Sequence, residues 1–428
     1  MSRAVPDRRR RPPMGWNSWD CYGTTVTEDE VLANAHFLSE HLLPLGWDTV
    51  VVDIQWYEPT ARAGGYNADA PLLLDRYGRQ LPVPARFPSA AGGAGFGPLA
   101  ERVHGLGLRF GLHVMRGIPR LAVRRDLPVA GTSWTAREIA STGSTCPWNS
   151  DNYGLDHDQP GAQAYYDAQV AQFAAWGVDF IKADDMLFPY HEREIEAYHR
   201  AIERSGRPIE LSLSPGRDLS AAHLHHLKDH CDLWRVSDDL WDRWPDVLAQ
   251  FPRMARWAPW QGPDGWADAD MLPLGRIGIR AERGGDRLSR LSHAEQVTLL
   301  TLWIIARSPL MMGGDLPTSP PETIELLSNR EALEVLWHST GGREVLREGD
   351  LVLWAADDPA GYRYAAVFSL ADEPTERAVP LASIGGEPTD AVRELWTHEE
   401  LVHDGTTLLL SLPAHGAALL RLTPADLW

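Results

Sequence analysis

Short apolar runs alternate with longer amphipathic segments from residue 14 to about residue 315. Such alternation is typical of strand–helix units that build a parallel sheet. Seven of the apolar runs predict strands, at residues 14–17, 48–53, 108–113, 178–184, 208–214, 233–237 and 308–312. An eighth strand is needed to close a barrel, and we place it near residues 258–261.

The amphipathic segments between these runs predict helices. Residues 27–43 have helical apolar spacing, with Thr27 and Glu30 placed as a capping box. Residues 161–176 and 293–307 share that spacing. Residues 115–155 form a long segment rich in Gly, Ser, Thr and Pro. Loops of such length in a compact domain usually carry function or cover a site.

The pattern changes after residue 330, where short apolar strands are separated by turns. We expect these strands at residues 351–354, 364–368, 391–396, 407–411 and 417–422. They are typical of an antiparallel sandwich. The predicted fold is therefore α/β: a (β/α)8 TIM barrel over residues 12–325, followed by a C-terminal antiparallel all-β sandwich domain over residues 330–428.

The net charge and the cysteine count limit which molecules the protein is expected to bind. The 428 residues include 59 acidic and 40 basic side chains, for a net charge of −19. Nucleic acids and anionic membrane surfaces attract clustered cations, so we expect neither as a partner. Three scattered cysteines make no disulfide scaffold or CxxC metal spacing. The basic run at residues 8–11 precedes no apolar signal segment, and we expect a cytoplasmic protein.

Two predicted strands end in carboxylates beside a fixed cation. One carries Lys182 and Asp184, and the other carries Arg235 followed by Asp238 and Asp239. Catalytic groups of a barrel lie at the carboxyl ends of its strands and face a shared pocket. Two carboxylates that converge from different strands are the minimum equipment for cleaving a glycoside. Lys182 lies two residues before Asp184, so both point to one face of the strand.

Several motifs, in this order, resemble glycoside hydrolase family 27, the α-galactosidase and α-N-acetylgalactosaminidase family of clan D. They are Pro-Pro-Met-Gly-Trp-Asn-Ser-Trp at 12–19, Lys-Ala-Asp at 182–184, Arg-Val-Ser-Asp-Asp at 235–239, Gly-Pro-Asp-Gly-Trp-Ala-Asp-Ala-Asp-Met at 262–271, and Ala-Arg-Ser-Pro-Leu at 306–310. No single motif is decisive, but the ordered set is specific. The chain is similar to a divergent, bacterial-type member.

The resemblance implies a retaining exo-acting glycoside hydrolase that works by double displacement. Asp184 would be the nucleophile that forms a covalent glycosyl-enzyme, and Asp239 would be the acid/base. Asp238 stays open as acid/base, because the choice depends on the four-residue spacing from Arg235. An Asp just after a strand is often a helix N-cap, and we favour that role for Asp185. The resemblance suggests no cofactor and no metal.

Residues that would bind the sugar follow from the same resemblance: Trp19, Asp53, His113, Lys182, Ser214, Arg235 and Asp268. Some have a second interpretation. His113 is either a pocket residue or a buried histidine with its hydrogen bonds satisfied. Asp268 and Asp270 are expected to organise the seventh loop more than to catalyse, although one of them could contact substrate.

The chain departs from the α-galactosidase pattern at two places that concern the sugar. After Asp53 the family's second Asp is replaced by Ile54, which accepts no hydrogen bond. Ser214 stands where galactosidases have Glu. Met186 replaces the family's usual cysteine, so the customary disulfide with Cys146 is not expected. An α-galactoside is the leading substrate, with α-N-acetylgalactosaminide, β-L-arabinopyranoside and α-1,6-glucan as alternatives within the same chemistry.

Two hypotheses from other classes stay open. A carbohydrate-binding barrel without catalysis is one, because one fold hosts unrelated functions. Ca²⁺ or Mg²⁺ binding by the paired Asp residues is the other, although neither pair has EF-hand spacing. The aglycone, the oligomeric state and the role of the sandwich domain do not follow from the sequence.

Overall fold

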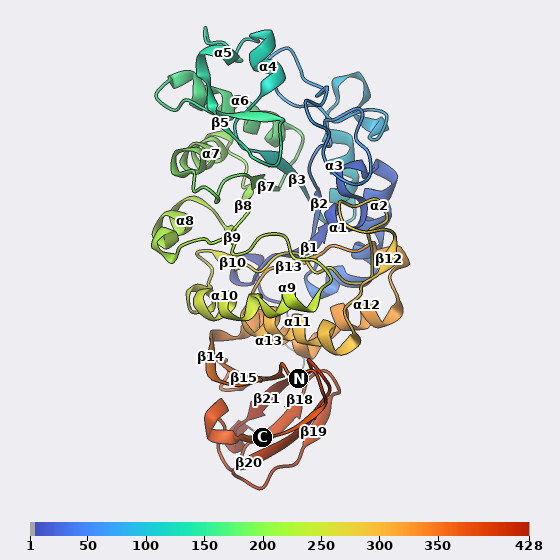
Figure 1. Cartoon of the computed structure of the whole chain (residues 1–428), viewed down its shortest axis with the longest axis vertical. Helices are drawn as coiled ribbons and strands as arrows, with labels where there is room; N and C mark the ends of the chain where they lie inside the picture. Colours follow the sequence, from blue (N-terminus) through green and yellow to red (C-terminus); the bar gives the residue numbers. More distant parts are fainter. Residues whose placement is uncertain (1–4, 428) are drawn as a thin grey trace.

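Eight parallel strands form the central sheet of the computed structural model, which describes residues 5–427 (Figure 1). The order in the sheet is β10-β9-β8-β7-β3-β2-β1-β13. The strands are β1 Met14–Asn17, β2 Thr49–Val52, β3 Arg109–Met115, β7 Phe180–Asp184, β8 Glu210–Leu213, β9 Leu233–Arg235, β10 Trp266–Asp268 and β13 Leu310–Met312. A parallel bridge between Leu272 and Met312 joins the two ends of this order, so the sheet closes into a barrel. The predicted TIM barrel is confirmed.

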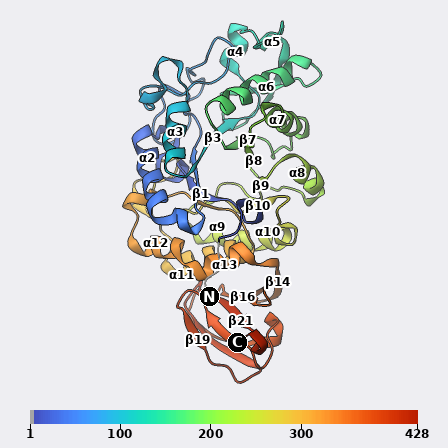
Figure 2. The ribbon, with the colours of Figure 1, turned by 180° about the vertical axis from the view of Figure 1, so that it is seen from behind.

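Helices surround the barrel, and Figure 2 shows them from behind. They are α1 Trp19–Tyr22, α2 Glu28–Phe37, α3 Gly97–Gly105, α6 Pro160–Ala175, α7 Glu192–Ser205, α8 Leu224–His230, α9 Trp244–Leu248, α10 Gln250–Trp257, α11 His293–Ile305, α12 Pro321–Ser328 and α13 Arg330–His338. The capping box of Thr27 and Glu30 starts α2 as predicted. This helix ends at Phe37 and continues as a π-helical turn to Leu42. None of the described helices combines the length and apolarity that crossing a membrane requires.

Side chains of each strand alternate between two apolar environments, as the period of two requires. Val50 and Val52 of β2 pack with the helices in the large outer core. Val51, between them, belongs to a separate apolar cluster with Phe180, Leu233 and other residues from the barrel strands. This cluster fills the interior of the barrel. The polar residues that share its face of each strand therefore point toward the barrel axis.

The eighth strand is β10, Trp266–Asp268, so its placement near residues 258–261 was wrong. Ala258–Trp260 is a 3-10 turn that follows α10. Pro259 lies within this turn and has no N–H to give to a sheet. The true strand is only three residues long, with Trp266 and Asp268 inward and Ala267 outward. Such a short strand carries too little alternation to be recognised.

The segment from Met115 to Leu155 is a small folded unit, although the sequence predicted a loop. Its elements are β4 Ile118–Pro119, α4 Arg120–Arg125, α5 Ala136–Ile139, β5 Ala140–Thr145 and β6 Asn152–Leu155. The three strands pair in the order β4-β6-β5. Strand β5 is composed of Ala, Ser, Thr and Gly and is largely exposed, so it has no apolar alternation to reveal it. A second small ribbon pairs β11 Arg276–Ile277 with β12 Arg287–Leu288.

Beyond α13 the chain forms two antiparallel sheets, drawn in orange to red in Figure 1. One sheet has six strands in the order β14-β15-β16-β21-β18-β19, and the other pairs β17 with β20. Their bounds are β14 Thr340–Glu348, β15 Leu351–Asp357, β16 Arg363–Ser369, β17 Thr375–Pro380, β18 Ala391–Glu394, β19 Glu399–Leu401, β20 Thr407–Leu412 and β21 Ala417–Thr423. The sequence did not predict β14, β17 or β19.

An apolar cluster between these two sheets confirms the sandwich. Leu353, Val367 and Leu420 of the larger sheet pack with Val379 and Leu408 of the smaller one. The domain bounds stay predictions. Residue 330 is the first residue of α13, which precedes the sheets, and Trp428 lies outside the described residues.

Helix α11 lies between the barrel and the sandwich and is buried from Val297 to Ile305. The hydroxyl of Thr298 donates to the backbone oxygen of His415, and the indole N–H of Trp396 donates to the hydroxyl of Thr301. A helix that is apolar on all sides must be covered on all sides. Barrel and sandwich therefore share one continuous apolar contact.

Candidate active site

Most of the predicted site residues lie on the inward faces of barrel strands, because each is an even number of residues from an interior apolar side chain. Lys182 and Asp184 follow Phe180 on β7, and Arg235 follows Leu233 on β9. The same rule applies to His113 with Met115, to Asp53 with Val51, and to Asp268 with Trp266. The fold thus gathers them near the carboxyl ends of the strands.

Asp184 is enclosed by hydrogen-bond donors. Its Oδ2 lies 3.0 Å from Nε2 of His113, and its Oδ1 accepts the backbone N–H of Asp185 at 2.9 Å. Only 15% of its side chain is exposed. Burial alone would raise the pKa of Asp184, but its hydrogen bond to His113 and the charge of Lys182 outweigh burial and lower it. The carboxylate is therefore held in its ionised form.

Lys182 forms its ion pair with Asp53, at 2.9 Å between Nζ and Oδ2. The same Oδ2 accepts from the amide of Asn17 at 2.8 Å, and Oδ1 accepts the backbone N–H of Ile54. Burial raises the pKa of Asp53, yet Lys182 and His113 lower it by more. Asp53 is a fixed anion whose oxygens are already engaged by the protein.

Arg235 contacts two carboxylates on the opposite side of the site. Its Nη1 lies 2.9 Å from Oδ1 of Asp270, and its Nη2 lies 3.3 Å from Oδ1 of Asp239. Asp270 is fully enclosed, whereas the side chain of Asp239 is 36% exposed. Burial raises the pKa of Asp270, and Arg235 opposes this rise. The closer pair, Arg235 with Asp270, leaves Asp239 the more loosely held carboxylate.

Asp238 and Asp239 differ in their surroundings. Asp238 is exposed, and its Oδ1 accepts the backbone N–H of Asp239 at 3.2 Å. Asp239 is the one within reach of Arg235. Asp268 lies deeper, where its Oδ1 accepts the backbone N–H of Asp270 at 2.8 Å. This contact matches the expectation that Asp268 organises the seventh loop.

The predicted helix-capping role of Asp185 was wrong. Asp185 is buried and forms an ion pair with Arg116, whose Nη2 lies 2.8 Å from its Oδ2. The next helix, α7, begins only at Glu192. Burial raises the pKa of Asp185 to about 6, and Arg116 limits the rise. Arg116 comes from the segment after β3, so no local pattern around Asp185 indicates this partner.

Asp184 and Asp239 line one cavity of about 300 Å³, together with Tyr66, Trp148, Pro215, Arg217, Asp238, Glu282 and Arg283. Trp19 stacks on Tyr66 with ring centroids 5.7 Å apart, and Tyr66 meets Trp148 at 5.6 Å. Flat aromatic faces at the mouth of a barrel suit the apolar faces of sugars. Sequence reasoning missed Tyr66, Glu282 and Arg283, which lie in long connections without periodic patterning.

Asp20 is another acidic residue that sequence reasoning missed. It follows Trp19, is 1% exposed, and its Oδ2 has no hydrogen-bond partner among the described residues. Burial raises the pKa of Asp20, and the nearby charges of Asp270 and Asp239 raise it further. Its position directly after the first-strand motif at 12–19 was the available signal.

The residues at the two sugar-determining positions are both buried. Ile54 is 1% exposed and belongs to the interior apolar cluster with Trp19, Met115 and Cys146. Ser214 is also 1% exposed, and its hydroxyl lacks a hydrogen-bond partner among the described residues. The site therefore has an apolar wall beside Asp53 and a hydroxyl free to meet a polar group.

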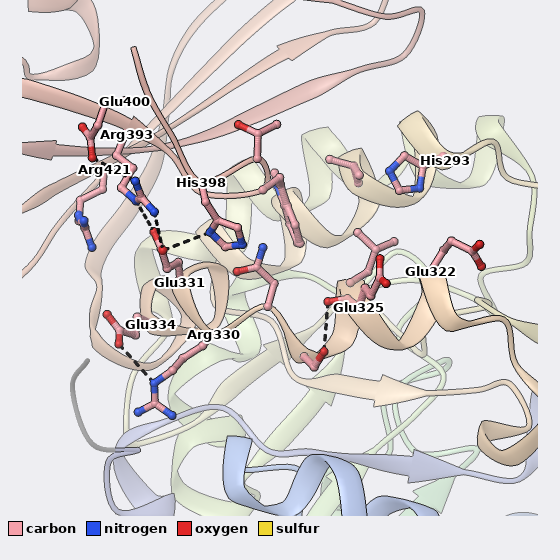
Figure 3. Close-up of a pocket in the computed structure, with 16 residues that line it drawn as sticks. His293, Glu322, Glu325, Arg330, Glu331, Glu334, Arg393, His398, Glu400 and Arg421 are labelled. Carbon is pink, nitrogen blue, oxygen red and sulfur yellow. Dashed lines mark hydrogen bonds and ion pairs between the residues drawn. The ribbon is translucent and has the colours of Figure 1, made fainter. Parts of the chain in front are cut away.

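A cavity of about 940 Å³ lies elsewhere, between α12, α13 and the sandwich. Figure 3 shows Arg393, His398 and Glu331 gathered on one side of it, with Glu322 and Glu325 apart from them. Arg393 pairs with Glu331 at 2.7 Å and with Glu400 at 3.1 Å, and His398 lies 3.1 Å from Glu331. These ion pairs engage Glu331 and Glu400. The predicted nucleophile and acid/base line the other cavity and not this one.

Comparison with known proteins identifies the family. The chain matches the family profiles described as alpha galactosidase A, over residues 154–336, and alpha galactosidase C-terminal beta sandwich domain, over residues 348–422. It is similar in structure to a GH27 β-L-arabinopyranosidase from Geobacillus stearothermophilus, with 46% identity, a TM-score of 0.94 and 97% of each chain covered. The chain belongs to glycoside hydrolase family 27. The resemblance read from the motifs is confirmed.

Curated relatives of this family 27 enzyme act on more than one sugar. Alpha-galactosidase 3 of Arabidopsis thaliana is 27% identical over 428 residues, which cover 97% of this chain and 82% of that protein. The alpha-N-acetylgalactosaminidase of Gallus gallus is 29% identical over 359 residues, 79% of this chain and 74% of its own. The chain is therefore a glycoside hydrolase, but membership of the family does not specify which sugar it cleaves.

Proposed function

We propose that the enzyme is a retaining, exo-acting β-L-arabinopyranosidase, with Asp184 as the nucleophile and Asp239 as the acid/base. The observation that carries the choice of sugar is Ile54, a buried apolar side chain where the family's galactosidases have a second Asp. The remaining site residues support the shared chemistry of the family.

Asp184 suits the role of nucleophile because its environment keeps it ionised. His113, Lys182 and the N–H of Asp185 favour its charged form and lower its pKa. A nucleophilic carboxylate must be anionic in the free enzyme at working pH. Its two contacts also fix the direction of the carboxylate toward the cavity.

Asp239 suits the acid/base, which must hold a proton in one step and release it in the next. One contact of 3.3 Å to Arg235 holds it, and a third of its side chain is exposed, so proton exchange with water is open. Asp238 is exposed and is not hydrogen-bonded to Arg235. We therefore assign Asp239 and keep Asp238 as its control.

The reaction has two displacements. In the first, an oxygen of Asp184 forms a bond to the anomeric carbon while the bond to the leaving oxygen breaks, and Asp239 gives that oxygen a proton. In the second, Asp239 takes a proton from water, whose oxygen attacks the anomeric carbon and releases Asp184. The sugar leaves with its original anomeric configuration, and Asp239 is protonated again.

Lys182, Asp53 and Asn17 would hold the sugar hydroxyls nearest Asp184. Lys182 has two further donors beyond its bond to Asp53, since an ammonium carries three. Asp53 retains acceptor capacity, because a carboxylate offers about four lone-pair sites. Ser214 supplies a buried hydroxyl without a protein partner, which would meet a ring substituent of the sugar.

The apolar wall beside Asp53 supports the choice of sugar. L-Arabinopyranose corresponds to galactose without C6, so it presents no hydroxymethyl group to this wall. Ile54 offers no acceptor to a C6 hydroxyl, and an unpaired buried hydroxyl costs about 1–3 kcal/mol. The related enzyme from Geobacillus stearothermophilus was crystallised with arabinose.

An α-galactoside is the second candidate. The plant relatives are α-galactosidases, and the interior cluster beside Ile54 could still accept a hydroxymethyl group by its carbon. The two sugars share the same anomeric chemistry, so one assay separates them without changing the assigned catalytic residues.

The test is kcat/KM on aryl β-L-arabinopyranoside and aryl α-D-galactoside for the wild type and for Ile54→Asp. We expect the wild type to prefer the arabinopyranoside by about 10-fold or more. Ile54→Asp should shift the ratio toward galactoside by about 10–200-fold, and Ile54→Val should leave it nearly unchanged. Proton NMR of the first-formed product should show retention for either sugar.

A wild type that prefers the galactoside would replace the proposed substrate with the second candidate. Inversion in the NMR experiment would contradict the double displacement. Activity that persists in Asp184→Asn would instead show that the measured turnover comes from another residue or a contaminating enzyme.

For its place in the cell we propose the cytoplasm, because Cys21, Cys146 and Cys231 are buried, free thiols that need no oxidising compartment. Burial raises the pKa of Cys146 to about 12, so this thiol is unreactive at neutral pH.

A further inference from the structure

Helices α7 and α8 carry a cluster of metal-binding side chains on the outer layer of the barrel, away from the residues assigned to catalysis. We infer that Glu196, His226 and His230 bind a divalent transition-metal ion, with Zn²⁺ as the best match. This site is additional to the glycosidase activity, and nothing in the reaction proposed above uses it.

The ligand atoms are already gathered. One nitrogen from each histidine and one oxygen of Glu196 lie within 4.8 Å of one another. His226 and His230 are four residues apart on α8, so they lie on the same face of that helix. In a tetrahedral zinc site the ligand atoms are about 3.3 Å apart, which follows from bonds of about 2.0–2.1 Å. The separation of 3.7 Å between His226 Nε2 and Glu196 Oε1 is close to this value.

Partners of the second ring nitrogens fix how the imidazoles are presented. Nδ1 of His230 lies 2.8 Å from the backbone oxygen of His226, and a carbonyl only accepts, so Nδ1 carries the proton. In the neutral imidazole, Nε2 of His230 then presents a lone pair to the cluster. Nδ1 of His226 is bonded to the hydroxyl of Tyr190 at 2.6 Å. Metal-bound histidines usually have this second bond, which orients the ring.

Nε2 of His226 is buried and has no hydrogen-bond partner among the described residues. Its nearest carboxylates, Glu196 at 3.7 Å and Glu192 at 3.9 Å, are beyond hydrogen-bond distance. Glu196 already accepts from Arg200 through Oε2 at 3.3 Å, which leaves Oε1 to face His226. A cation between Oε1 and the two imidazoles would give Nε2 of His226 a partner, and water would complete the tetrahedron.

The consequence of binding would be structural. Helix α7 follows β7, the strand of Asp184, and α8 follows β8, which precedes Ser214. A bridging ion would join these neighbouring helices and stabilise the folded state by an amount that rises with the logarithm of the zinc concentration divided by Kd. His and carboxylate ligands suit Zn²⁺ better than Ca²⁺ or Mg²⁺, which prefer all-oxygen sites.

The experiment uses untagged, full-length enzyme that has been treated with a chelator. Zn²⁺ is titrated by calorimetry and by competition with a chromophoric chelator. We expect one ion per chain with micromolar or tighter affinity, and a zinc-dependent rise in the melting temperature. His226→Gln, His230→Ala and Glu196→Gln should each weaken binding by about tenfold or more. His225→Ala, an exposed neighbour on α8, is the matched control and should bind zinc like the wild type.

Two results would overturn the inference: a wild type that binds no zinc at micromolar concentrations, or zinc binding that survives both histidine substitutions. Turnover of the aryl glycoside in each variant reports that the barrel has folded. Because zinc affinity is measured directly, a failed substrate assignment would leave this result intact, and a failed zinc titration would leave the substrate assignment intact.

Discussion

Asp184 and Asp239 face the same cavity from two strands, yet their surroundings differ in almost every respect. Asp184 is 15% exposed and accepts from a histidine and from a backbone N–H. Asp239 is 36% exposed and has one long contact to an arginine that is closer to another carboxylate. The first environment favours the ionised form of Asp184. The second leaves Asp239 more exposed, with a single long contact to a donor. Paired carboxylates divide their roles through such differences.

The two cations reinforce this contrast. Lys182 pairs with Asp53, and its positive charge still helps to lower the pKa of Asp184. Arg235 pairs with the buried Asp270, so much of its charge is neutralised before it reaches Asp239. Three variants test whether this difference determines the roles, and a fourth tests the buried charge of Asp20. They follow in order of expected effect.

Asp184→Asn removes the proposed nucleophile and should reduce kcat/KM by about 10⁴-fold or more on every aryl glycoside. An amide is nearly the same shape, so circular dichroism and melting should show an intact fold. A variant that retains its fold and loses less than tenfold would remove Asp184 from the mechanism.

Asp239→Asn removes the proposed acid/base and should cost about 10²–10⁴-fold on a substrate with a poor leaving group. The loss should be far smaller on a dinitrophenyl glycoside, which needs no protonation, and added azide should restore turnover there. Asp238→Asn is the control and should behave like the wild type. The reverse pattern would transfer the role to Asp238.

His113→Asn tests the environment that keeps Asp184 ionised. His113 is the leading favourable influence that lowers the pKa of this carboxyl, so its loss should raise that pKa. The acidic limb of the kcat/KM profile should then move to higher pH, with activity preserved near neutrality. If the acidic limb does not move, Lys182 and the backbone N–H of Asp185 are sufficient to keep Asp184 ionised.

Asp20→Asn should stabilise the protein. Burial raises the folded-state pKa of Asp20 above its unfolded value, so wild-type stability falls as the pH rises from the unfolded pKa to the folded one. The neutral amide removes this loss. We expect the free energy of unfolding to rise by about 1 kcal/mol at neutral pH and to be unchanged in acid. Denaturant unfolding of the wild type and the variant at neutral and acidic pH measures these two free-energy differences. Equal differences at the two pH values would contradict a destabilising charge on Asp20.

Periodic features of the sequence were predictable, and contacts between distant segments were not. Lys182 and Asp184 could be placed on one face because a strand has a period of two, and the capping box of Thr27 and Glu30 is local. The aromatic stack of Tyr66 on Trp19 joins a connection to a strand end, and no spacing rule encodes it.

The predicted capping role of Asp185 and the predicted position of the eighth strand were wrong for a related reason. Asp185 has the local pattern of a helix cap, but the guanidinium of Arg116 reaches it from another strand end. Strand β10 is too short for an alternating pattern, and the apolar run before it forms a helical turn around Pro259. In both cases a tertiary contact or a proline outweighs the local signal.

Helix α11 has a consequence for anyone who would shorten this enzyme. Its residues from Val297 to Ile305 are buried, and the sandwich supplies part of that cover through His415 and Trp396. A truncated chain ending near residue 338 would expose the apolar surface of α11 and lose its two hydrogen bonds to the sandwich. Every assigned catalytic residue would remain. We therefore expect the minimal stable unit to be longer than the catalytic barrel, because the sandwich completes the cover of α11.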